Sequence, residues 1–196
     1  MFVNVGFPST SFGVYQPYIV AVPGMSHADG SIVVTVRNLS SLVTIFFVAF
    51  YYKKLDCRLG IFLGTLTTAL GFLVFSFANN LFLFVCASII AGMGYGFAGT
   101  SAMTILIGRW HDKNTGTPMG IATVGSSVAG FFVPMVVLFV VSNGGVNEAF
   151  AIQAIFTFVT AILLFIFVRN NPNGYVKKEV AKIDKKEKQP LPKRKY

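Results

Sequence analysis

The chain has 196 residues, of which 54% are hydrophobic and 12% are charged, and its mean hydropathy is +0.68. A soluble domain of this size could not bury so much apolar surface, so the composition excludes an ordinary soluble fold. The net charge of +9 would indicate nucleic acid binding only if the bases formed a patch on a globular surface. Here they are concentrated in two short loops and the C-terminal tail, which is typical of membrane proteins.

Six apolar segments are each long enough to cross a bilayer as a helix, which takes about 20 residues. We therefore expect an all-α membrane bundle within residues 1–172. Its predicted spans are about 2–22, 31–51, 59–78, 81–107, 117–142 and 147–168. The connections are short, so consecutive helices should be antiparallel neighbours.

The first span carries polar and proline residues, which indicates that it faces protein or water instead of lipid. On an ideal helix, four of its polar side chains project within about 60° of one another. These are Asn4, Ser11, Tyr15 and Tyr18. One interpretation is a polar stripe that lines a cavity and orients a small anion. The other is that the two tyrosines belong to an aromatic belt at the outer membrane interface.

The second span contains Arg37, the one basic residue of the chain that lies inside a predicted span. Arg37 is about 9 Å along the helix from Ser31, so it could extend to the outer headgroups. Alternatively, its planar guanidinium faces inward and binds a carboxylate. No Asp or Glu lies in the interior of a predicted span, so its counterion would be a substrate, a lipid phosphate or a residue of a partner half. The same absence of embedded carboxylates favours anion exchange or facilitated movement over proton symport.

The fourth and fifth spans are rich in small residues, which let membrane helices approach closely. The glycines that we expect to serve this packing are Gly92, Gly96, Gly99, Gly125 and Gly130. Tyr95 and Thr104 in the fourth span are further candidates for a cavity.

Basic residues occur in the second loop (Lys53, Lys54 and Arg58), in the fourth loop (Arg109 and Lys113) and from Arg169 onward. The first, third and fifth loops contain none, so the positive-inside rule places both termini in the cytoplasm. Residues 173–196 should form a flexible basic tail. Its two interpretations are a solvated linker between halves and a segment attracted to anionic lipids.

Three stretches together resemble the N-terminal six-helix half of a major facilitator superfamily transporter. They are SFGVYQPYIV (11–20), RWHDKNTGTPMGIATVGSSVAG (109–130) and RNNP (169–172), and they are most similar to the monocarboxylate and oxalate/formate antiporter group. The resemblance implies a cytoplasmic gate formed by Lys53, Lys54, Asp56, Arg58, Arg109 and Trp110. Arg109 and Trp110 also suit a boundary anchor. The loop YYKKLDCRLG (51–60) departs from the superfamily pattern, since alignment on Arg58 puts Lys53 where an acidic residue is usual.

We therefore expect half of a transporter for a small organic anion, such as a monocarboxylate or oxalate, in a bacterial cytoplasmic membrane. Arg37 would bind the carboxylate, Tyr15 and Tyr18 would shape the site, and a second six-span half would come from another chain or another copy. The alternative is a truncated or remnant half that transports nothing and serves as a membrane interaction protein. The sequence has no metal-ligand cluster, phosphate loop or paired carboxylates, so we expect no enzyme activity, no cofactor, no metal and no nucleic acid partner.

Overall fold

The structure of the chain is a computed structural model that describes residues 6–20, 22, 24–110 and 115–168; for residues 7–11 and 109–110 it describes the backbone alone. Regular secondary structure in these ranges is helical throughout, so the prediction of an all-α fold is confirmed. The helices are α1 (Phe7–Val20), α2 (His27–Lys54), α3 (Cys57–Ser76), α4 (Leu81–Ala98), α5 (Thr100–Trp110), α6 (Gly116–Gly144) and α7 (Val146–Phe167).

Five described helical segments are long and apolar enough to cross a membrane. They are α2, α3, the combined segment Leu81–Gly108, α6 and α7. The helix α1 has 14 described residues, fewer than the roughly 20 that a span needs. Many large apolar side chains face outward, such as Phe46 and Phe139, which are 78% and 72% exposed. An apolar exterior of this kind suits contact with lipid, and the chain is a multi-pass membrane protein.

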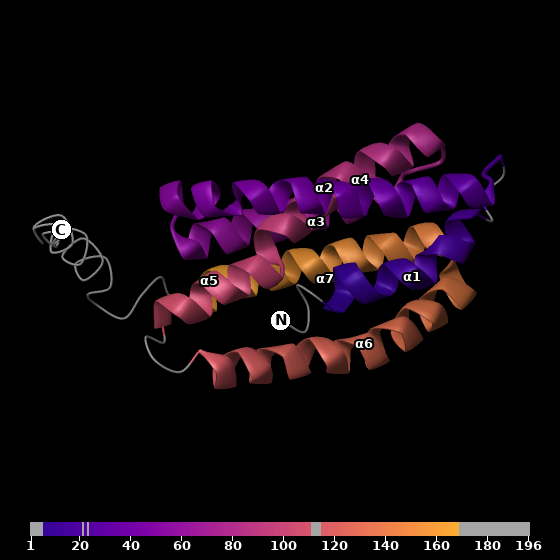
Figure 1. Cartoon of the computed structure of the whole chain (residues 1–196). Coiled ribbons are helices and arrows are strands. Elements are labelled where there is room, and N and C mark those ends of the chain that lie inside the picture. Colours follow the sequence, from indigo (N-terminus) through magenta and orange to yellow (C-terminus); the bar gives the residue numbers. More distant parts are fainter. Residues whose placement is uncertain (1–5, 21, 23, 111–114, 169–196) are drawn as a thin grey trace, which may run out of the picture.

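The helices lie side by side along a common direction, and α6 curves along one edge of the bundle (Figure 1). The most extensive contacts join α4 to both α2 and α3, and α3 to α7, whereas α1 touches α6, α2 and α7 less extensively. Pro134 lies inside α6 and lacks the N–H that would bond the carbonyl of Gly130, which accounts for a bend. Because the contacts of α6 with α1 and α7 are less extensive than those of α4 with α2 and α3, the bundle is more loosely packed around α6.

The second helix begins at His27, four residues before the start predicted from hydropathy. Its first turn is held by a capping box, in which the Asp29 N–H donates to the Ser26 hydroxyl and the Ser26 N–H donates to the Asp29 carboxylate. These bonds satisfy backbone donors that would otherwise have no partner at the helix start. Residues 27–30, which hydropathy assigns to a loop, thus form the first turn of α2.

The predicted fourth span, 81–107, is one apolar segment, but its helix is interrupted at Gly99. The backbone of Gly99 has a ψ of −139°, and α5 starts at the next residue. A Cβ atom at Gly99 would lie 2.5 Å from the carbonyl oxygen of Tyr95, so the site admits only glycine without a shift. Gly99 therefore forms a break in the helix, in contrast to its predicted role in helix packing.

The centre of the bundle is an aromatic cluster supplied by α1, α3, α4 and α7. Its fully buried members are Tyr15, Phe72, Phe75, Phe84 and Phe150. The Phe75 ring is stacked on Phe150 at 5.0 Å and lies 5.9 Å from Phe84. A second, smaller cluster at the end where α2 meets α3 contains Val48, Tyr52, Cys57, Ile61 and Ala102.

Candidate functional site

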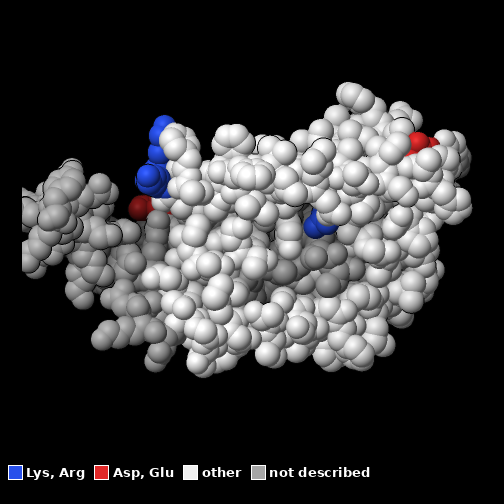
Figure 2. Space-filling view, viewed as in Figure 1, with Lys and Arg blue, Asp and Glu red and all other residues white. Residues whose placement is uncertain are grey.

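Charged atoms are rare on the face shown in Figure 2. Basic atoms gather at one end of the described bundle, and one small basic area lies apart from them in a recess partway along the molecule. The basic residues of the described side chains are Arg37, Lys53, Lys54 and Arg58. All but Arg37 lie at the junction of α2 and α3.

Arg37 lies ten residues after the start of α2, so about 15 Å along that helix. Only 5% of its surface is exposed. The guanidinium carbon is 4.7 Å from the centre of the Phe12 ring on α1 and 5.2 Å from the centre of the Tyr95 ring on α4. One terminal nitrogen also donates to the side-chain oxygen of Asn38 at 3.4 Å. The side chain therefore points into the bundle, between α1 and α4, instead of along α2 toward its end.

Small residues bring the three helices around Arg37 together. A Cβ on Gly92 of α4 would lie 2.4 Å from the Arg37 carbonyl oxygen, and one on Gly96 would lie 2.7 Å from Thr44. A Cβ on Gly30 of α2 would lie 2.6 Å from Val20 of α1. The backbones are thus close enough for Phe12 and Tyr95 to reach the guanidinium.

Tyr15 is placed at the interface of α1 with α7. Its hydroxyl donates to the side-chain oxygen of Gln153 at 2.6 Å and lies 3.4 Å from the carbonyl of Ala149. Its ring packs 4.2 Å from the ring of Phe150. These contacts join Tyr15 to α7, whereas the Arg37 guanidinium is in contact with Phe12, one turn earlier on α1.

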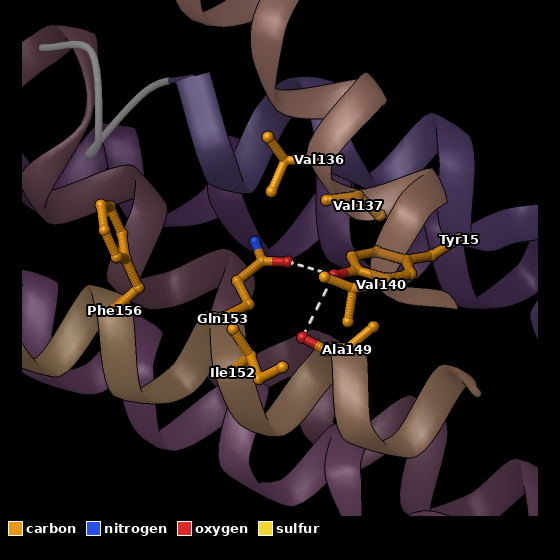
Figure 3. Close-up of a pocket in the computed structure, with 8 residues that line it drawn as sticks. All are labelled: Tyr15, Val136, Val137, Val140, Ala149, Ile152, Gln153 and Phe156. Carbon is orange, nitrogen blue, oxygen red and sulfur yellow. Dashed lines mark hydrogen bonds between the residues drawn. The ribbon is translucent and has the colours of Figure 1, made fainter. Parts of the chain in front are cut away.

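Beside this hydrogen bond lies a cavity of about 110 Å³ between α1, α6 and α7. Figure 3 shows Tyr15 and Gln153 meeting at its wall, which Val136, Val137 and Val140 of α6 also line. Pockets for small molecules are usually several times larger. This cavity is better explained as a packing gap next to the bent helix α6 than as a substrate site.

A larger, open groove of about 520 Å³ runs between α2 and α4. It is lined mainly by apolar side chains, among them Val43, Phe47 and Met93. The Ser40 hydroxyl in its wall donates to the carbonyl of Ile89 at 2.9 Å, so its proton is already used. The groove therefore suits an apolar ligand such as a hydrocarbon chain. None of its lining residues is positively charged, so it has no group that would pair with an organic anion.

The remaining predicted members of the polar stripe are less fully described. Tyr18 is half-buried and packs against the aromatic cluster. Ser11 lies within α1, and Asn4 falls outside the described residues. Of the five residues predicted to bind substrate, the structure thus describes the side chains of Arg37, Tyr15 and Tyr18.

The predicted cytoplasmic gate centres on the junction of α2 and α3. Lys53 and Lys54 are exposed in the last turn of α2, where positive charge stabilises the helix end, and exposed Asp56 precedes α3. Arg58 instead turns toward α7: its Nε donates to the carbonyl of Phe165, and its guanidinium lies 4.2 Å from that ring. Arg58 therefore connects the start of α3 to the end of α7.

Two tyrosines next to these charges tie α2 to its neighbours. The Tyr51 hydroxyl donates to the carbonyl of Gly60 at 3.1 Å, and the Tyr52 hydroxyl donates to the carbonyl of Phe97 at 2.8 Å. The rings of Tyr51 and Phe97 are stacked at 4.1 Å. This end of the bundle is thus held by specific contacts among α2, α3 and α4.

Other predicted residues lie elsewhere in the bundle. Gly125 and Gly130 are half-buried in α6, Thr104 is exposed on α5, and Arg109 and Trp110 close α5. Among the residues that the structure describes, no group of three His, Cys, Asp or Glu is placed to hold a metal ion.

Sequence reasoning missed Phe12 and Gln153. Phe12 is one of 21 phenylalanines, and nothing in the sequence distinguishes the ring that meets the guanidinium. Gln153 could have been noticed, because it is an amide inside an apolar segment and such residues usually make bonds between membrane helices. Tyr95, by contrast, is one of the residues that the sequence suggests for a cavity, and its ring centre lies 5.2 Å from the Arg37 guanidinium carbon.

Comparison with known proteins gives a match to one family model and similarity to two curated relatives. The family model described as Major Facilitator Superfamily matches residues 1–195. A human protein named Monocarboxylate transporter 14 is 25% identical over 131 residues, which cover 65% of this chain and 26% of the human protein. Its mouse counterpart is also 25% identical over 131 residues, covering 25% of that protein. The matched region thus spans about a quarter of the length of these relatives.

Proposed function

Because this chain belongs to the major facilitator superfamily, we propose that it carries a small organic anion across a membrane by alternating access. The substrate class is a monocarboxylate or an oxalate-like acid, a class consistent with the name of the human and mouse relatives. The proposed arrangement has six spans with both termini in the cytoplasm. A second six-helix half, from another chain or another copy, completes the pathway. The bacterial cytoplasmic membrane stays a prediction, and the two relatives are mammalian.

The observation that carries this proposal is the guanidinium of Arg37 inside the bundle. A cation held among apolar helices is costly and by default marks a site for a negatively charged partner. Its planar array of N–H donors matches the two oxygens of a carboxylate. Since α1, α2 and α4 all contribute side chains around it, a bound anion would touch three helices at once.

The small exposed fraction of Arg37 supports a state in which the site is covered. In this proposal, movement of α1 and α4 relative to α2 uncovers the guanidinium to the membrane side from which substrate enters. Lys53, Lys54, Asp56, Arg58, Arg109 and Trp110 take part in closing the cytoplasmic side. Tyr15, Tyr18, Ser11 and Asn4 remain proposed to shape the pathway along α1.

Uptake of a labelled monocarboxylate by liposomes that contain the purified chain tests the proposal. We expect Arg37→Ala to reduce the initial uptake rate about a hundredfold, because it removes a charged hydrogen-bonding partner. Arg37→Lys should retain part of the rate, since it keeps the charge and loses the planar fork. Lys185→Ala, which removes one positive charge from the tail, serves as the matched control and should leave uptake unchanged.

Equal uptake by Arg37→Ala and the unsubstituted chain would exclude Arg37 as the anion site. Absence of uptake by the unsubstituted chain, together with a strictly monomeric state and no co-purifying partner, would instead support the alternative of a membrane protein that does not transport. The oligomeric state in mild detergent is therefore measured on the same preparation.

A further inference from the structure

Phe12 has two contacts that together fix its ring between α2 and α3. On one side its centre lies 4.7 Å from the Arg37 guanidinium carbon. On the other side it meets the Phe75 ring edge-on, with centres 5.4 Å apart and planes at 67°. Only 2% of Phe12 is exposed. The ring therefore has little room to move away from the guanidinium.

The contact is attractive for electrostatic reasons. The face of an aromatic ring carries negative charge density, so it stabilises a cation placed over it, and the effect is strongest where water is excluded. Arginine commonly makes such contacts by stacking the flat face of its guanidinium on the ring. The N–H groups that bind a carboxylate lie in the plane of the guanidinium, so ring and anion do not compete for the same atoms.

Resting on the proposed function above, we infer that Phe12 is a positioning residue, which orients the Arg37 guanidinium for the carboxylate of the substrate. A long arginine side chain loses much rotational freedom when it binds a ligand, and holding it in one orientation beforehand reduces that cost. The Tyr95 ring, 5.2 Å from the same carbon, assists from α4. Because Phe12 belongs to α1, the affinity of the site depends on how closely α1 approaches α2.

Replacing Phe12 by pentafluorophenylalanine is the most direct test. Fluorination reverses the charge distribution of the ring face and changes its shape little, so packing is retained while the attraction is lost. The matched control is the same replacement at Phe84, which is equally buried and whose ring meets Phe75. Phe12→Leu and Phe12→Trp complete the set, because the first removes the ring and the second keeps a strong cation-binding face.

Two quantities are measured on the full chain in detergent. The first is propionate affinity, taken from the thermal stabilisation that increasing propionate produces, with neutral propionamide as the blank. The second is the rate at which an arginine-specific dicarbonyl reagent modifies Arg37, followed by mass spectrometry. We expect the fluorinated Phe12 and Phe12→Leu to weaken propionate binding about tenfold and to accelerate modification several-fold. Phe12→Trp and fluorinated Phe84 should remain within about twofold of the unsubstituted chain.

The outcomes separate this inference from the proposed function. If the unsubstituted chain binds propionate and fluorination at Phe12 changes neither quantity, the positioning role is wrong and the proposed function stands. Equal effects at Phe12 and Phe84 would also overturn it, because they would show a general packing effect. If neither propionate nor oxalate stabilises the unsubstituted chain, the proposed function fails, and the inference fails with it.

Discussion

Phe12 and Tyr15 stand one turn apart on α1 and contact different neighbours. Phe12 meets Arg37 of α2 and Phe75 of α3, while Tyr15 meets Gln153 and Phe150 of α7. Residues three apart on a helix project about 60° from one another, so one helix can serve two interfaces. The polar group of Tyr15 is thereby used in holding α1 to the bundle.

Tyr15→Phe should lower the stability of the protein. The substitution removes a buried hydrogen bond of 2.6 Å and keeps the ring that packs on Phe150. The expected loss is about 1–2 kcal/mol of unfolding free energy, measured by thermal or denaturant unfolding in detergent. Tyr18→Phe removes a hydroxyl from a half-buried residue of the same helix and should change stability by less than about 0.5 kcal/mol.

The same two variants test the predicted substrate role of these tyrosines. If a variant raises the KM for anion uptake and leaves stability unchanged, the hydroxyl that it removes belongs to the substrate pathway. Loss of stability with unchanged KM would assign it to the contact between α1 and α7 alone.

Glycines on two faces of α4 let this helix pack closely against two neighbouring helices. Gly92 and Gly96 meet α2, whereas Gly94 meets α3, where a Cβ would lie 2.4 Å from the backbone nitrogen of Thr68. Gly99 then ends the helix. Alternating glycines thus let a single helix pack closely on both sides, which a helix of larger residues could not do.

Gly92→Ala should destabilise the bundle, since the added methyl group would meet the Arg37 backbone and one helix would have to shift. The expected decrease in Tm is about 5 °C, and anion uptake should fall because Arg37 moves with α2. Gly120→Ala is the control: it lies in α6 with nothing within 4 Å of its Cβ position. Helix propensity there predicts an unchanged or slightly raised Tm. Equal destabilisation by both variants would contradict the close contact of α4 with α2.

At the scale of the whole molecule, the described charges lie mainly at the ends of an apolar bundle. Lys53, Lys54 and Arg58 lie at the turn between α2 and α3, and the α3–α4 turn contains Asn79 and Asn80 but no base. With the positive-inside rule, this arrangement predicts the α2–α3 turn in the cytoplasm and the α3–α4 turn outside.

Single cysteines placed in these turns test the proposed orientation. Both native cysteines, Cys57 and Cys86, are first replaced by alanine, and Asn79→Cys and Asp56→Cys are then compared, since both positions are exposed. A membrane-impermeant maleimide should label Asn79→Cys in intact cells. Asp56→Cys should react only after the membrane is opened. The reverse labelling pattern would show that the orientation in the membrane is opposite to the one proposed.

The sequence by itself determined the helical class, the membrane environment and the family resemblance. These depend on features that are local or summed along the chain: apolar segments, the distribution of bases and short motifs. It also identified Arg37, because a single base inside an apolar segment is unusual whatever surrounds it. The start of α2 and the break at Gly99 were missed, since capping bonds and one backbone dihedral leave hydropathy almost unchanged.

Only the tertiary structure decided what surrounds Arg37. Whether the guanidinium reaches a headgroup or enters the bundle depends on which face of α2 meets α1 and α4, and that is set by glycines on other helices, such as Gly92. The choice of Phe12 among many phenylalanines, and of Gln153 as the partner of Tyr15, likewise depends on contacts between residues far apart in the chain. Helical periodicity describes each helix alone, whereas the rotation of one helix against another is determined by side-chain packing.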